Sequence, residues 1–179
     1  MDKSMQPFPH PGFIKCNSYP SDLLGEYPSY EAVKVAIKSY LIGLAKTGGK
    51  CTFRTLYSSL CLPLYVTYSF HRKLIGEICS EINGEEYAAG RPLIGVLLCS
   101  ESDGYITGKG FFDLMQYPEF CEGFPHGLDK EIKQHRAAFF GIHAQKCWLY
   151  WHKRKKAEEK AADEGGIGLT LNPRNCITQ

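Results

Sequence analysis

The chain has 179 residues and a mass of 20.1 kDa, which suits one ordinary domain with short ends. Hydrophobic residues make up 44% and charged residues 22%, so the chain can bury a core and is not a disordered polyampholyte. The net charge is only +2. The longest apolar run, residues 92–99, falls far short of the roughly 18 residues of a membrane span, and no hydrophobic signal-peptide core begins the chain. We therefore expect a cytoplasmic protein with no membrane partner.

Residues 1–28 form a predicted N-terminal arm, because five prolines interrupt regular structure there. The first predicted helix follows, with Ser29 as its N-cap and apolar residues at helical spacing up to a stop at residues 48–49, which are both glycine. Its period places Lys34 and Lys38 off the apolar stripe, with no acid to pair with.

Two more helices are predicted before any strong strand. Thr52 caps the second helix, which ends before Pro63 because the residue preceding a proline disfavours the helical conformation. Ser69 caps the third helix, whose apolar face leads to a stop at residues 83–84, an Asn-Gly pair.

A continuous apolar run predicts the first strand, over residues 92–99. Residues 102–104 supply a turn, and residues 105–107 return as a second strand, which gives a β-hairpin. Three helices followed by a hairpin is the element order of a winged helix-turn-helix domain. The predicted fold class is α+β, with a winged-helix core at residues 29–127.

A long final helix is predicted over residues 128–162. Its apolar face is too wide for a lone amphipathic helix, so the helix either packs across the domain or forms a homodimer. Residues 163–179 are expected to be disordered.

Eight cysteines are scattered along the chain without a Cys-x-x-Cys pair, and several lie in apolar periodic segments. A thiol in such a segment behaves as a small hydrophobe, so we expect reduced cysteines in a cytoplasmic protein. The alternative is an oxidised, secreted framework, which usually serves shorter chains that lack a core.

The charges are strongly segregated along the sequence. Residues 32–76 contain seven Lys or Arg residues and no Asp or Glu, whereas acids dominate residues 77–103. A basic face of this kind favours a polyanion or an acidic partner, although ordinary solvated faces can sort in the same way.

Together with the winged-helix element order, the basic stretch predicts non-covalent binding of double-stranded DNA by a regulatory or defence protein of a prokaryote or phage. In such a domain the third helix enters the major groove, and flanking cations neutralise phosphates. Glu77 and Glu81 would repel phosphate, so only the first turn of the third helix is expected to read DNA. No cofactor and no metal are expected. The predicted DNA-binding residues are Lys34, Lys38, Lys50, Thr52, Arg54, His71, Arg72 and Lys73.

Four short segments carry a resemblance to known proteins: residues 52–57 (TFRTLY), 74–78 (LIGEI), 90–94 (GRPLI) and 108–112 (GKGFF). They span about a third of the chain, which resembles a group of small uncharacterised prokaryotic proteins. It is also distantly similar to the helix-turn-helix half of alkylguanine-DNA alkyltransferases, and this similarity implies DNA binding. Those enzymes carry a reactive thiol in a Pro-Cys-His-Arg motif. Here Cys99 stands in Leu-Cys-Ser-Glu, so a buried structural thiol is expected instead.

Two other functions remain open at this stage. One is a protein-interaction module, an inhibitor or adaptor. The other is a metal-dependent nuclease, with Glu86, Arg91, Glu101 and Lys109 as its candidate group. The aromatic surface of the interaction module would consist of Phe139, Phe140, Trp148, Tyr150 and Trp151.

A zinc site is the last possibility on the final helix. His143 and Cys147 are spaced for one helical face and could hold zinc, but a buried thiol beside a histidine explains them more simply.

Overall fold

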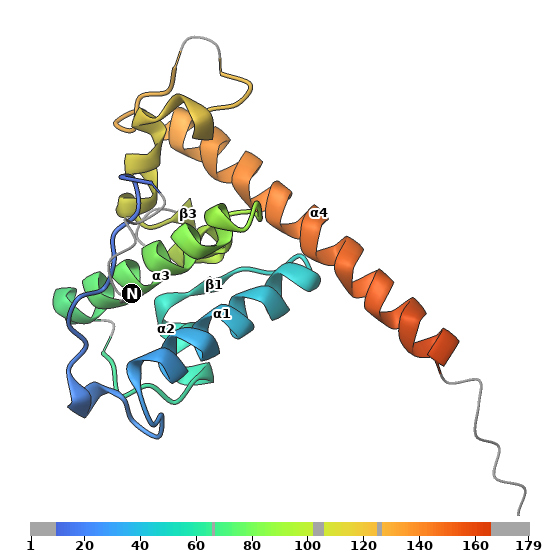
Figure 1. Ribbon diagram of the computed structural model, residues 1–179. Helices are drawn as coiled ribbons and strands as arrows, with labels where there is room; N and C mark the ends of the chain where they lie inside the picture. Colours follow the sequence, from blue (N-terminus) through green and yellow to red (C-terminus); the bar gives the residue numbers. More distant parts are fainter. Residues whose placement is uncertain (1–9, 66, 102–105, 125–126, 166–179) are drawn as a thin grey trace, which may run out of the picture.

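The computed structural model describes residues 10–65, 67–101, 106–124 and 127–165, in which helices surround a small sheet (Figure 1). The α-helices are α1 (Tyr30–Lys46), α2 (Phe53–Ser59), α3 (Ser69–Ala88) and α4 (Lys133–Gly165). The strands are β1 (Cys51–Thr52), β2 (Leu98–Ser100) and β3 (Ile106–Thr107). The described 3-10 segments are η2 (Ser21–Leu23), η3 (Ile94–Leu97), η4 (Lys109–Gln116) and η5 (Pro118–Phe120).

Side-chain caps start the first two helices, as predicted. The Ser29 hydroxyl accepts a hydrogen bond from the Ala32 amide at 3.3 Å, and the Thr52 hydroxyl accepts one from the Thr55 amide at 3.2 Å. Such caps satisfy amides that have no partner inside the helix. The predicted second helix is therefore confirmed as α2, with Thr52 as its cap.

Helix α3 starts near the predicted residue but ends later than predicted. Ser69 is its first residue and not its cap, since the cap position belongs to Tyr68, which makes no capping hydrogen bond with its side chain. The predicted stop at Asn83 is wrong, because the Asn83 side chain is buried and accepts a hydrogen bond from the Gly95 amide at 2.8 Å. The helix ends only before Gly90, whose φ of 65° suits a residue without a side chain.

The apolar run at residues 92–99 is a strand only at its end, which corrects the prediction. Residues 94–97 form the 3-10 segment η3, which packs against α1, α3 and α4 and is buried on all sides. A short apolar run of this kind is equally compatible with a strand and with a buried helical turn.

The sheet has the order β1-β2-β3. Strands β2 and β3 pair antiparallel, with Cys99 opposite Thr107, as the predicted hairpin requires. The predicted turn at residues 102–104 lies outside the described residues. Strand β1 was not predicted; it pairs parallel to β2, with Cys51 opposite Leu98.

Helix α4 crosses the domain and extends beyond it (Figure 1). It starts at Lys133, five residues later than predicted, and its contacts with α1, η3 and η4 bury Phe139, Phe140 and Trp151. The predicted aromatic surface on this helix is therefore wrong, because most of its members belong to the core. Within the described residues, no helix has the length and apolar character needed to cross a bilayer.

An ionic cluster joins α1 to α3. Lys34 is only 7% exposed, and its amine lies 2.8 Å from Glu81 and 2.9 Å from Glu85. The Lys38 amine lies 3.0 Å from Glu85 and 2.8 Å from Glu86. The prediction that these lysines have no acid to pair with is wrong, because folding brings the acidic end of α3 beside them.

The described part of the N-terminal arm is ordered against α3. Phe13 is buried, the Ile14 amide donates to the Ser80 hydroxyl at 2.8 Å, and the Cys16 amide donates to Glu81 at 3.1 Å. These contacts hold the arm alongside one end of the site described next.

Candidate functional site

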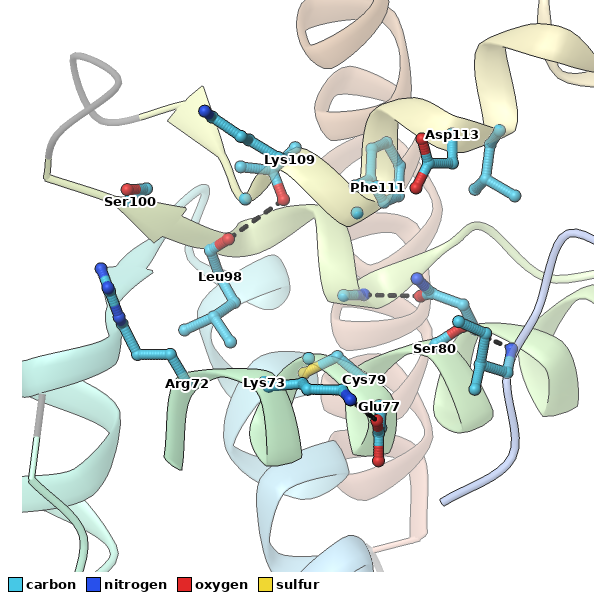
Figure 2. A pocket seen from close by; sticks show the side chains of 18 of the residues that line it. Arg72, Lys73, Glu77, Cys79, Ser80, Leu98, Ser100, Lys109, Phe111 and Asp113 are labelled. Carbon is cyan, nitrogen blue, oxygen red and sulfur yellow. Dashed lines mark hydrogen bonds and ion pairs between the residues drawn. The ribbon is translucent and has the colours of Figure 1, made fainter. Parts of the chain in front are cut away.

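A cleft of about 630 Å³ separates the exposed face of α3 from the sheet and η4 (Figure 2). Ser69, Arg72, Gly76 and Ser80 line it from α3, while residues 107–111 line the opposite wall. The arm residues 12–14 also line the cleft. Its volume falls in the range of pockets that bind small molecules.

One end of the cleft is basic. Arg72 and Lys109 extend from opposite walls at the same end (Figure 2). Both are exposed, and neither forms an ion pair with another described residue. Lys73 is exposed as well, but its amine lies 3.8 Å from Glu77 on the same helix. This end can therefore accept a multiply charged anion.

Other parts of the cleft are apolar. Phe53 lines it from the start of α2, and Leu98 and Phe111 line it from β2 and η4. Phe111 is half-buried, and its ring packs against Phe139 with centroids 5.6 Å apart. The two phenylalanine rings offer flat apolar surface in the same cleft as the two cations.

The ring of Tyr57 contacts Phe53, which lines the cleft, and the Tyr57 hydroxyl is buried. Among the described residues it has no hydrogen-bond partner. Burial raises the pKa of Tyr57, and the nearby Arg72, which lines the cleft, opposes that rise. A buried polar group without a partner is unusual, and the indole nitrogen of Trp151, which does not line the cleft, is in the same state among the described residues.

Two of the predicted DNA-binding residues line the cleft, and a third follows a residue that lines it. Arg72 and Lys73 lie on the first turns of α3, and Arg54 follows Phe53 at the start of α2. The Arg54 side chain is 70% exposed, and its Nε atom lies 3.9 Å from Glu101. Lys109 joins them from the opposite wall, although it was predicted only as part of a nuclease group.

The other predicted DNA-binding residues do not line the cleft, and each makes contacts within the chain. Lys34 and Lys38 belong to the ionic cluster and are compensated within the chain. Thr52 caps α2, and His71 is buried with its Nδ1 atom accepting from the Tyr65 amide at 2.9 Å. The Lys50 amine lies 5.3 Å from the centroid of the Phe140 ring.

The predicted nuclease group does not converge. Glu86 is completely buried and pairs with Arg91, whereas Glu101 lies beside Arg54 and Lys109 lines the cleft. Across the described ranges, no group of three His, Cys, Asp or Glu side chains has the geometry to hold a metal ion.

The remaining reactive residues are engaged in the core. Burial raises the pKa of Cys99 to about 11, which leaves its thiol protonated at neutral pH. His143 hydrogen-bonds the Phe120 carbonyl at 3.0 Å, and the Cys147 thiol donates to the Leu93 carbonyl at 3.4 Å. The explanation of Cys147 as a buried thiol beside a histidine fits these contacts.

Three exposed aromatic side chains that the sequence pattern did not reveal lie near Ser69, which lines the cleft. Tyr65, Tyr68 and Phe70 are 64%, 58% and 53% exposed around the start of α3. The Tyr65 and Tyr68 rings contact each other, with centroids 5.6 Å apart. In the sequence, these three residues differ from the aromatic residues of the core only in lying in or next to the short linker between α2 and α3.

No family model matches the chain, and no match is found among curated proteins or solved structures. The resemblance to the helix-turn-helix half of alkylguanine-DNA alkyltransferases therefore stays a prediction.

Proposed function

We propose that the chain binds double-stranded DNA non-covalently, with residues 29–127 acting as a winged helix and α3 as its recognition helix. The supporting observation is a group of exposed cations, which we call the basic rim. Arg72, Lys73 and Lys109 line the cleft, and Arg54 follows Phe53, which also lines it. The rim lies where α2, the start of α3 and the β2-β3 hairpin meet. These are the elements with which a helix-turn-helix protein approaches the DNA backbone.

Two acids reduce the charge of the basic rim without cancelling it. Glu77 and Glu101 lie 3.8 and 3.9 Å from Lys73 and Arg54, near the outer limit of an ion pair. The two basic side chains are largely exposed, and exposed pairs of this length contribute little and are screened by salt. A phosphate can therefore compete for both cations.

Helix α3 can present only its first two turns to DNA, because most of the residues after Glu77 are buried. A duplex would meet this helix end-on and find few side chains that reach base edges. Since base contacts carry sequence specificity, we infer that affinity comes mainly from phosphates and that specificity is low.

The salt dependence of DNA binding tests this proposal. Four phosphate contacts predict a slope of log K against log salt of about −3 to −4, measurable by fluorescence anisotropy with a labelled duplex. Arg72→Ala should make the slope less steep by about 1 and weaken binding at low salt by about tenfold.

A lysine far along the chain provides the matched control. Lys133→Ala removes one exposed positive charge at the start of α4 and should leave the slope unchanged. The proposal fails if the protein does not bind the duplex at low salt, or if Arg72→Ala and Lys133→Ala have the same effect.

The exposed aromatics favour a second candidate function, contact with a protein partner. Aromatic side chains are enriched at protein interfaces, and Tyr65, Tyr68 and Phe70 provide such a surface beside the basic rim. Replacing all three by Ser should leave DNA affinity within about threefold and the salt slope unchanged, because phosphate binding rests on the cations. A larger loss in the anisotropy assay would assign the aromatics to DNA and remove the support for a protein partner.

A further inference from the structure

We propose that the cleft binds a free nucleotide, a ligand that joins a flat aromatic base to a phosphate. Three properties of the cleft select this class: its size, its cationic end and its apolar walls. Nucleotide binding itself does not depend on the proposed DNA binding, whereas the competition described below rests on it.

The size of the cleft excludes a duplex and suits a mononucleotide. A volume of about 630 Å³ lies well within the range of small-molecule pockets. A DNA duplex can touch the mouth of such a cleft but cannot enter it. A nucleotide would therefore bind inside the cleft and a duplex outside it, and both would contact the basic end.

The cationic end is suited to a phosphate. Arg72 and Lys109 lie there on opposite walls (Figure 2), and neither is neutralised by an acid of the described chain. A guanidinium can donate two parallel hydrogen bonds to phosphate oxygens, while an ammonium adds a point charge. A doubly charged phosphate would match these two cations.

The apolar walls are suited to an aromatic base. Phe53 and Phe111 line the cleft from different elements, and both are half-buried, so each still presents ring surface. Stacking on an aromatic side chain tolerates every base, because each base has a π-face. Glu77 also lines the cleft and can accept hydrogen bonds from the amino groups of a base.

The shared cations imply competition between the two ligands. Arg72 and Lys109 belong both to the basic rim and to the cationic end of the cleft. A nucleotide bound there neutralises two of the four rim charges, so it should weaken DNA binding.

Titration calorimetry on the full chain tests the site. Adenosine and guanosine 5′-monophosphates should bind with a dissociation constant of about 0.1 to 1 mM. Adenosine, which lacks the phosphate, and inorganic pyrophosphate, which lacks the base, should each bind at least about tenfold more weakly. Equal binding of pyrophosphate and nucleotide would overturn the role of the apolar walls.

Two glycines provide a matched pair of variants. Gly76 lines the cleft on α3 and Gly43 is exposed on α1, and a Cβ atom added at either meets nothing within 4 Å. Gly76→Trp should fill the cleft and weaken nucleotide binding more than about tenfold, whereas Gly43→Trp should bind as the wild type does. Lys109→Ser, which removes an exposed charge without touching the core, should weaken binding about tenfold.

The outcomes separate this inference from the proposed function. No saturable nucleotide binding up to about 10 mM, or unchanged binding in Gly76→Trp, would overturn the nucleotide site even if DNA binds with the expected salt slope. If nucleotides bind but duplex DNA does not, the site stands and the proposed function fails. If both bind, added nucleotide should displace the labelled duplex, and failure to do so would overturn the competition.

Discussion

Glu86→Ala should lower the free energy of unfolding by about 3 to 5 kcal/mol, because it breaks a buried ion pair by removing one partner. The Glu86 side chain is completely buried. It accepts two hydrogen bonds of 2.7 Å from Arg91, one on each carboxylate oxygen, and its Oε1 atom lies 2.8 Å from the Lys38 amine. The alanine variant leaves two partly buried cations without this partner. Urea unfolding followed by circular dichroism would measure the loss.

The pH dependence of stability gives the same residue a second readout. Burial raises the pKa of Glu86, but the hydrogen bonds from Arg91 and Lys38 outweigh it, so the pKa lies below its usual value of 4.5. A carboxyl whose pKa is lower in the folded state stabilises the fold above its unfolded pKa, and this contribution is lost as the pH falls through the folded pKa. The wild type should therefore lose more stability than Glu86→Ala on acidification below 4.5.

A surface ion pair of similar length is the control for Glu86. Glu122 lies 2.6 Å from Lys146, but its side chain is 77% exposed, so Glu122→Ala should leave the unfolding midpoint nearly unchanged. The double variant Glu86→Leu with Arg91→Met should recover part of the loss, because apolar side chains of similar volume need no partner. A Glu86→Ala midpoint equal to that of Glu122→Ala would contradict the assignment.

Phe139→Ala should lower the free energy of unfolding by about 3 to 5 kcal/mol, because it opens a cavity where α4 meets the rest of the core. Phe139 is 1% exposed. Its ring lies 5.6 Å from Phe111, 6.3 Å from Phe112 and 4.5 Å from His143, measured between centroids. The same variant removes the support behind the Phe111 ring, so it should also weaken nucleotide binding in the cleft.

Both tryptophans of the chain lie on α4, so their fluorescence reports the docking of this helix. The fluorescence and circular dichroism transitions of Phe139→Ala should coincide and shift together if α4 unfolds with the core. Leu149 is 56% exposed on the same helix, and Leu149→Ala should change stability by less than about 0.5 kcal/mol. If the fluorescence transition had its midpoint at a much lower urea concentration than the circular dichroism transition, α4 would instead detach before the core unfolds.

The sequence predicts the helices well wherever a local interaction sets their ends. Ser29 and Thr52 start helices by capping amides three residues away, which is a property of neighbouring residues alone. The Asn83-Gly84 pair is a local sequence signal for a helix end. The Asn83 side chain instead accepts a hydrogen bond from the distant Gly95 amide, and the helix continues. Strand β1 is two residues long and exists through its pairing with β2, so no local pattern marks it.

The candidate site was predicted only in part, for a related reason. Arg54, Arg72 and Lys73 lie on the consecutive helices α2 and α3, and two of them, Arg72 and Lys73, line the cleft. Lys109 comes from η4 beyond the hairpin, and only the packing of that segment over α3 brings it to the same cleft. The prediction that the lysines of α1 have no acid to pair with overlooked Glu31, three residues before Lys34, and could not foresee Glu81 and Glu85, each 47 positions from its lysine.

The ionic cluster between α1 and α3 also constrains how the chain can change over generations. A substitution that reverses the charge of Lys34 places like charges side by side in a buried position unless Glu81 and Glu85 change as well. A lineage with a single such substitution would pass through a poorly folded intermediate. Descendants of this chain should therefore keep the positive charge at position 34 as long as they keep the two acids of α3.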